Sequence, residues 1–176
     1  MRIISGKYKS RQIPVRKNFP SRPTTDFAKE GIFNVIGNFF DFENIIVLDL
    51  FAGTGSIGYE FSSRGAQVDM VDSDSRSVHF INSVISDFKM NDIRVLKADV
   101  FRIVPKLDKQ YDIIFADPPY TMRDIETLPG LIFTSGILKP EGWFILEHPH
   151  RLSLNKEARY RETRKYGNVN FSIFTW

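Results

Sequence analysis

The sequence predicts an α/β fold with a mostly parallel sheet, helices on both faces and an antiparallel strand at the C-terminal edge. From residue 45 onward, apolar runs of strand length alternate with segments of helix length, which is typical of parallel strands joined by helices. Near the C-terminus, Gly167-Asn168 separates two strand-like segments and indicates a tight hairpin. The length of 176 residues suits one domain of this kind.

The hydrophobic pattern also predicts where the elements lie. Strands are expected over residues 45–51, 67–71, 93–97, 111–116 and 142–147, and the closing hairpin over 160–166 and 169–176. Helices are expected over 28–39, 56–63 and 75–89. Ligands of such sheets bind beyond the carboxyl ends of the strands, so the loops that follow the strands should hold the functional residues.

The first 25 residues differ in charge from the rest of the chain. They contain seven basic residues and no acidic residue: Arg2, Lys7, Lys9, Arg11, Arg16, Lys17 and Arg22. Short apolar alternations interrupted by Gly6 and Pro14 predict a β-hairpin arm over residues 1–25, ahead of a single domain over 26–176. Concentrated positive charge suits a phosphate backbone, although a solvated basic terminus has the same composition.

Composition excludes several classes of site. The chain has no cysteine, which removes disulfides, iron–sulfur clusters and thiolate zinc sites. Its three histidines are His79, His148 and His150, and no metal site is predicted. For His148 and His150 a plain loop position is expected. No apolar run approaches the roughly 18 residues of a membrane span, and the N-terminus lacks the apolar core of a secretion signal, so a cytoplasmic location is expected.

The loop after the first predicted strand is rich in glycine. Gly53, Gly55 and Gly58 satisfy G-x-G-x-x-G, which allows a ligand to approach the backbone closely but also fits a dinucleotide-binding turn. Asp49 lies four residues before Gly53, at the end of an apolar strand, where a carboxylate is costly without a partner. The α-ammonium of a methionine moiety is a suitable partner, whereas a pyrophosphate would be repelled. Capping of the following turn is the alternative role of Asp49.

Acidic residues also follow the second and third predicted strands. Asp72 comes fourteen residues after Gly58, where an acid usually accepts hydrogen bonds from ribose hydroxyls in nucleoside-binding α/β folds. Asp99 can accept a hydrogen bond from an adenine amino group. For both residues the alternative is a helix cap, and Asp74 is expected to cap the helix after the second strand.

The loop after the fourth predicted strand is Asp117-Pro118-Pro119-Tyr120. Successive prolines fix φ and donate no N–H, so the loop can present the Asp117 side chain and the Pro118 carbonyl as two acceptors. Such a pair can hold both N–H bonds of a base amino group and expose its lone pair. Tyr120 offers a surface for base stacking, worth on the order of 1–3 kcal/mol. A plain surface turn is the alternative.

These motifs resemble those of Rossmann-like class I methyltransferases that act on amino groups. More narrowly, the chain resembles the bacterial small-subunit ribosomal RNA guanine-N2 methyltransferases of the RsmD type. The similar segments are 1–11, 22–26, 29–34, 48–55, 117–120 and 165–167. Two positions depart from the family, which usually has arginine where this chain has Lys29 and glutamate where it has Asp72. Both exchanges preserve charge.

The resemblance implies an enzyme that transfers a methyl group from S-adenosylmethionine to N2 of a guanine in small-subunit ribosomal RNA. It implies a monomer that acts on a partly assembled small subunit. The implied cofactor-binding residues are Asp49, Phe51, Gly53, Gly55, Asp72, Ser73, Asp99 and Val100. The implied catalytic residues are Asp117, Pro118 and Tyr120. The implied RNA-binding residues are Arg2, Lys7, Lys9, Arg11, Arg22 and Thr24.

Three other functions compete with this interpretation. Adenine-N6 methylation of DNA or RNA uses the same proline loop, and only the N-terminal resemblance favours guanine. An NAD-dependent oxidoreductase shares the glycine loop, but it does not explain Asp117-Pro118-Pro119-Tyr120, the basic arm or Asp49. A non-catalytic RNA-binding domain has no need of a rigid acceptor pair.

Overall fold

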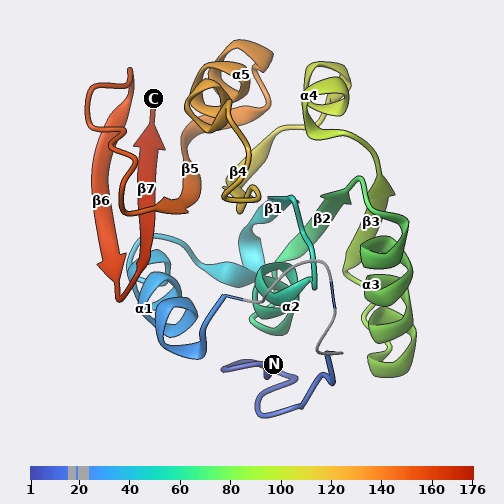
Figure 1. Cartoon of the computed structure of the whole chain (residues 1–176). Helices are drawn as coiled ribbons and strands as arrows, with labels where there is room; N and C mark the ends of the chain where they lie inside the picture. The colour runs from blue at the N-terminus through green and yellow to red at the C-terminus, as the bar shows by residue number, and fades with distance from the viewer. Residues whose placement is uncertain (16–18, 20–23) are drawn as a thin grey trace.

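The computed structural model describes residues 1–15, 19 and 24–176, and these form a seven-stranded sheet in the order β3-β2-β1-β4-β5-β7-β6 (Figure 1). The strands are β1 Ile46–Leu50, β2 Gln67–Asp72, β3 Ile93–Lys97, β4 Tyr111–Ala116, β5 Leu138–Pro149, β6 Tyr160–Tyr166 and β7 Val169–Thr175. Strands β1 to β5 are parallel, whereas β7 runs antiparallel to β5 and β6 antiparallel to β7. The predicted fold class is confirmed.

Helices cover both faces of the sheet. They are α1 Asp26–Ile36, α2 Ser56–Ser63, α3 Ser75–Phe88, α4 Val100–Ile103 and α5 Leu128–Ser135. One core cluster contains side chains of α1, α2 and α3, and the other contains side chains of α4 and α5. Among the described residues, no helix is long and apolar enough to cross a membrane.

Alternation along the central strands assigns each residue to one of these faces. Val47, Ile113 and Ile145 belong to the cluster shared with α1, α2 and α3. Leu48, Ile114 and Phe144 belong to the cluster shared with α4 and α5. Because side chains alternate along a strand, Asp49, Asp117 and Glu147 continue the first of these rows. These three acids therefore point to the face covered by α1, α2 and α3.

The N-terminal residues fold back against α2 (Figure 1). An isolated antiparallel bridge joins Arg2 to Gln12, so the predicted hairpin is a turn closed by one bridge rather than a pair of strands. The Glu60 carboxylate accepts hydrogen bonds from Ile4 N at 2.8 Å and from Ser5 N at 3.0 Å. This part of the predicted arm is fixed to the helix that follows the glycine loop. The division at residue 25 stays a prediction.

Lys29 links this N-terminal turn to the glycine loop. Its Nζ donates to Arg2 O at 2.7 Å and to Ser56 Oγ at 3.3 Å, and lies 3.8 Å from Glu60 Oε2. Ser56 is the first residue of α2, directly after Gly55. Burial lowers the pKa of Lys29, while the Glu60 charge opposes that shift. The N-terminal segment and the glycine loop are thus joined through one buried ammonium group.

Helix boundaries differ from the prediction near α1 and between β4 and β5. The helix expected over 28–39 begins at Asp26, where Thr25 caps it, and ends at Ile36 before Gly37. Phe39, at the end of the expected helix, therefore lies outside α1, where it is 56% exposed and contacts the Trp143 ring. Helix α5 was not expected from the sequence, because Leu128-Pro129-Gly130 interrupts any helical pattern with two weak helix formers.

Strand β5 is longer than expected at both ends. His148 lies within it rather than in a loop, and it is buried. Its Nε2 lies 2.8 Å from Ser172 Oγ on the neighbouring strand β7. The apolar run that predicted this strand stops at Leu146. The hydrophobic pattern therefore did not indicate that the strand continues through the polar contact between His148 and Ser172. The C-terminal hairpin around Gly167 and the N-cap role of Asp74 are confirmed.

Candidate active site

The glycine loop between β1 and α2 has an unusual backbone. Phe51, Gly53 and Gly55 all have positive φ, at 59°, 55° and 78°. A Cβ on Gly55 would lie 2.5 Å from the Tyr59 ring, so the loop tolerates only glycine there. Phe51 adopts this conformation with a side chain, which costs on the order of 1–3 kcal/mol and is most often found at functional sites. The loop therefore packs Tyr59 directly against the Gly55 backbone, and its three positive φ values are typical of a functional loop.

Asp49 is the buried acid beside this loop. It is 2% exposed, and its Oδ2 accepts a hydrogen bond from Gly58 N at 2.9 Å. Burial raises the pKa of Asp49 to about 7, and the Asp72 charge adds to the shift. The hydroxyl of Tyr59 is buried nearby with no hydrogen-bond partner among the described residues. A carboxylate without a cation and an unpaired hydroxyl form a site suited to a positively charged group.

The acids after β2 and β3 are both engaged with backbone. Asp72 accepts from Gly53 N at 2.7 Å and from Asp74 N at 2.8 Å, so it ties the first loop to the second. Asp99 caps α4 by accepting from Arg102 N at 3.1 Å. Each carboxylate has about four lone-pair sites, so capping leaves capacity for ligand hydroxyl or amino groups. Ser73 is exposed beside Asp72, and Val100 is buried beside Asp99.

The Asp117-Pro118-Pro119-Tyr120 loop directly follows β4. Asp117 N donates to Leu50 O at 3.3 Å, which holds the start of the loop against the end of β1. Asp117 is half-buried, Pro118 is buried and Tyr120 is 42% exposed. Burial, Glu147 and Asp49 all raise the pKa of Asp117 well above its usual value. The structure therefore brings Asp117 close to Asp49.

Glu147 completes this group, and the sequence interpretation did not include it. It lies near the carboxyl end of β5 and is 4% exposed. Tyr120 Oη donates to its Oε1 at 3.3 Å, and Thr24 Oγ1 donates to its Oε2 at 3.1 Å. Burial raises the pKa of Glu147 to about 7. An acid at the end of an apolar strand is the signal that identified Asp49, and the same signal was present here.

The predicted RNA-binding residues do not gather at this site. Lys7 Nζ pairs with Asp92 at 3.2 Å, just before β3, and the Arg11 guanidinium lies 4.8 Å from the Phe88 ring at the end of α3. They therefore lie near the amino end of β3, opposite the carboxyl ends that bear the acids. Lys9 is exposed in the same turn, and Arg2 pairs with Asp26 at 2.7 Å. Arg22 lies outside the described residues.

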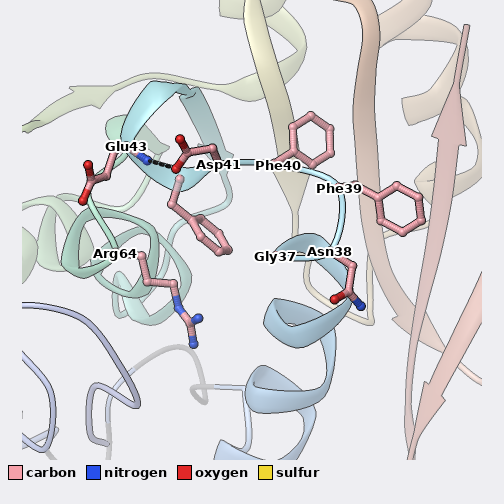
Figure 2. A pocket seen from close by; sticks show the side chains of 8 residues that line it. Gly37, Asn38, Phe39, Phe40, Asp41, Glu43 and Arg64 are labelled. Carbon is pink, nitrogen blue, oxygen red and sulfur yellow. Dashed lines mark hydrogen bonds between the residues drawn. The ribbon is translucent and has the colours of Figure 1, made fainter.

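Thr24 differs from the other predicted RNA-binding residues. It is 8% exposed and donates to Glu147, so it lies within the acidic group rather than on a basic surface. An open cleft of about 550 Å³ elsewhere in the molecule is lined by residues 37–43 and Arg64 (Figure 2). It lies before the start of β1 and contains none of the predicted site residues, so we assign it no part in the chemistry.

The sheet order, the loops at its carboxyl ends and the closing hairpin define a Rossmann-like methyltransferase fold. The hypothetical protein TTHA0928 of Thermus thermophilus has the same structure with a TM-score of 0.89 and 25% identity, covering 100% of this chain and 99% of that one. The proposed methyltransferase YhhF of Escherichia coli matches with a TM-score of 0.84 and 25% identity, covering 99% and 96%.

The chain belongs to the family described as Conserved hypothetical protein 95, which matches residues 1–175. This is the RsmD family that the sequence motifs indicated. A relative in Buchnera aphidicola (subsp. Baizongia pistaciae), named ribosomal RNA small subunit methyltransferase D, is 30% identical over 183 residues. That match covers 97% of this chain and 93% of the relative.

Proposed function

We propose that this protein transfers a methyl group from S-adenosylmethionine to the N2 amino nitrogen of a guanine in small-subunit ribosomal RNA. The observation that supports this most is the position of the Asp117-Pro118 loop, beside Asp49 and on the same face of the sheet. A methyl donor held at one strand end would then face an amino group held at the next. The relative named ribosomal RNA small subunit methyltransferase D supports ribosomal RNA as the substrate.

The residues around the glycine loop fit the cofactor. When bound, S-adenosylmethionine supplies an electrophilic methyl group on a positively charged sulfur. Asp49 and the unpaired Tyr59 hydroxyl are suited to its ammonium group, and the backbone of Gly53 and Gly55, which carries no Cβ, would face its methionine part. Lone pairs that remain on Asp72 would accept the ribose hydroxyls.

The adenine part would lie between the loops after β1 and β3. Asp99 would accept from the adenine amino group, while the apolar side chains of Phe51 and Val100 would pack on the ring and Ser73 would lie at its edge. Because capping of α4 uses one oxygen of Asp99, the other remains available. Phe51 is only partly buried, which leaves a face of its side chain accessible to a ligand.

Asp117 and Pro118 would hold the target amino group. Their two oxygens accept its two N–H bonds, which exposes the nitrogen lone pair and aligns it for attack. As the new N–C bond forms, the nitrogen must lose a proton, and the Asp117 carboxylate is the acceptor in contact with it. The raised pKa of Asp117 makes it a better proton acceptor than an ordinary aspartate. Tyr120 would stack on the base.

The position of the basic N-terminal residues favours a large folded substrate. Parallel strands of five or six residues span about 17–20 Å, and β2 and β1 lie between β3 and β4, so Lys7 and Arg11 lie at least roughly that far from Asp117. Phosphates bound by residues 1–25 would therefore belong to nucleotides well away from the target base. This separation suits a monomer acting in the cytoplasm on RNA that is already folded in an assembling small subunit.

Charge reversal of Lys7, Lys9 and Arg11 should weaken RNA binding and reduce its salt dependence. Each phosphate contact that is lost lowers the slope of log affinity against log salt by about 0.7–0.9, so the triple variant should lose roughly two units or more. Affinity measured by filter binding at several salt concentrations tests this. Reversal of the exposed Lys106, Lys156 and Lys165 is the charge-matched control. An unchanged slope in the N-terminal variant would remove this segment from the RNA interface.

Transfer of label from methyl-labelled S-adenosylmethionine tests the proposed substrate. The purified protein would receive small ribosomal subunits that lack methylated guanines, bare ribosomal RNA or unmethylated DNA. We expect label in the subunits, less in bare RNA and none in DNA. Label confined to DNA would contradict the proposal.

A further inference from the structure

Glu147 lies beside Asp117, although methyl transfer itself requires only one of these carboxyl groups. Ala116 on β4 is in register with Leu146 on β5, so Asp117 and Glu147 follow at the same level. Adjacent strands are about 4.8 Å apart, and both side chains point to the face covered by α1, α2 and α3. The Glu147 charge raises the pKa of Asp117, as expected for neighbouring acids. The site therefore has two acidic acceptors side by side.

The acceptor capacity of Glu147 is only partly used. Each of its oxygens accepts one hydrogen bond, from the Tyr120 hydroxyl and from the Thr24 hydroxyl, whereas a carboxylate offers about four lone-pair sites. None of the ion pairs formed by the described part of the chain includes Glu147. The buried carboxyl group of Glu147 therefore has room for a further donor. The two hydroxyls fix its orientation, and the donor would come from a ligand.

The chemistry of the bases identifies that donor. Adenine, cytosine and guanine each carry an amino group next to a ring nitrogen. In guanine the neighbouring N1 carries a hydrogen, whereas N1 of adenine and N3 of cytosine present a lone pair. The oxygens of two adjacent carboxyl groups therefore match the N1–H and N2–H donors of guanine, and they place a carboxyl oxygen against a lone pair in the other two bases.

We propose that Glu147 is the residue that selects guanine, by accepting a hydrogen bond from N1–H while Asp117 accepts one from the N2 amino group. This inference rests on the proposed function. Tyr120 and Thr24 hold the carboxylate in place through their hydroxyls, so Thr24 acts on the base through Glu147. Sites built to hydrogen-bond a substrate group reject analogues that lack it by up to about 10⁴–10⁵-fold.

The test compares guanine with 2-aminopurine at the target position. Once the methylated guanosine has been located, RNA containing either base there is made by splinted ligation and assembled into subunits. The analogue keeps the 2-amino group but has no hydrogen on N1. We expect wild-type protein to methylate 2-aminopurine at least about 100-fold more slowly than guanine. In E147Q the ratio of the guanine rate to the 2-aminopurine rate should fall to about 10-fold or less, because the glutamine amide can donate a hydrogen bond to N1. The analogue also lacks O6, but that loss affects both proteins equally.

A conservative variant and a control separate recognition from folding. E147D keeps a carboxylate, so it should slow transfer but preserve the preference for guanine. E162Q, on β6, should leave both rates unchanged. Every variant should still unfold cooperatively, and its affinity for S-adenosylhomocysteine should stay within about twofold of that of wild type.

Two results would overturn the inference. If E147Q slowed both substrates by the same factor, Glu147 would only support Tyr120. If wild-type protein produced no N2-methylguanosine, the proposed function would fail first, and that failure is visible before any variant is compared.

Discussion

Replacing Asp117 with alanine should lower the single-turnover rate of methyl transfer by at least roughly 10²–10³-fold, the usual effect of removing one preorganised hydrogen-bonding group from an active site. The variant loses both an acceptor for the amino group and the group that receives its proton. Affinity for S-adenosylhomocysteine, measured by calorimetry, should change little, because the glycine loop and Asp49 remain. Rapid-quench assays with saturating cofactor measure the rate.

Two further variants sharpen that experiment. Asp117→Asn keeps an acceptor oxygen but cannot take up the proton, so its rate should fall between those of wild type and the alanine variant. Asp124→Ala, in the same loop with an exposed side chain, is the matched control and should behave as wild type. If Asp117→Ala lost cofactor affinity as severely as activity, Asp117 would belong to the cofactor site rather than to the reaction.

Asp49→Asn should have opposite effects on binding and on stability. Asparagine can still accept from Gly58 N, but it cannot offer negative charge to an ammonium group. We expect affinity for S-adenosylhomocysteine to fall by about 10²-fold, in keeping with the loss of about 2–3 kcal/mol for a charged hydrogen bond. The ligand-free variant should nevertheless be more stable than wild type at pH 8.

The gain in stability follows from the direction of the pKa shift. Burial raises the pKa of Asp49 from 3.8 to about 7, so the folded protein binds more protons than the unfolded chain between these values. The free energy of unfolding therefore falls as pH rises through that window, by up to about 4 kcal/mol above pH 7. Asp72 and Asp117 carry the charges that face Asp49, and both are present in the variant.

Urea unfolding at pH 5 and pH 8 measures this effect. The difference in the free energy of unfolding between Asp49→Asn and wild type should grow by about 2–3 kcal/mol from pH 5 to pH 8, because most of the Asp49 titration lies between these values. Asp117 and Glu147 remain in both proteins, so the difference reports the ionisation of Asp49 together with its effect on the pKa of Asp117. If the free energy of unfolding of the variant exceeded that of wild type by the same amount at both pH values, ionisation of Asp49 would not destabilise the folded protein.

The fold was predictable where local pattern and tertiary structure agree. The buried parallel strands read as apolar runs, and α2 begins and ends at the expected residues because the glycine loop fixes its start. The sequence did not predict the local structure correctly where contacts between distant parts of the chain determine it. Phe39 follows helical spacing from α1, but the chain turns at Gly37 and places it on Trp143. Helix α5 forms despite Pro129 and Gly130, with the proline in its first turn.

The candidate site was predictable to the extent that strand order brings strand ends together. Asp49 and Asp117 were both expected at the carboxyl ends of strands, but the order that makes β1 and β4 neighbours, and so brings the two residues together, was not predicted. Glu147 was missed because no glycine or proline motif accompanies it. Its bond with Thr24 joins residues 123 positions apart, and no local pattern indicates such a contact. The position of the basic turn near the opposite end of β3 likewise depends on how the N-terminus packs on α2.

The most direct test of the central claim is the identity of the methylated nucleoside. Small subunits labelled by the wild-type protein would be digested to nucleosides, and the labelled product identified by mass and chromatographic mobility. The arrangement of Asp117, Pro118 and Glu147 predicts N2-methylguanosine. Label in N6-methyladenosine would leave the fold and the methyl donor in place, but it would contradict the assignment of two acidic acceptors to the N1–H and N2 edge of guanine.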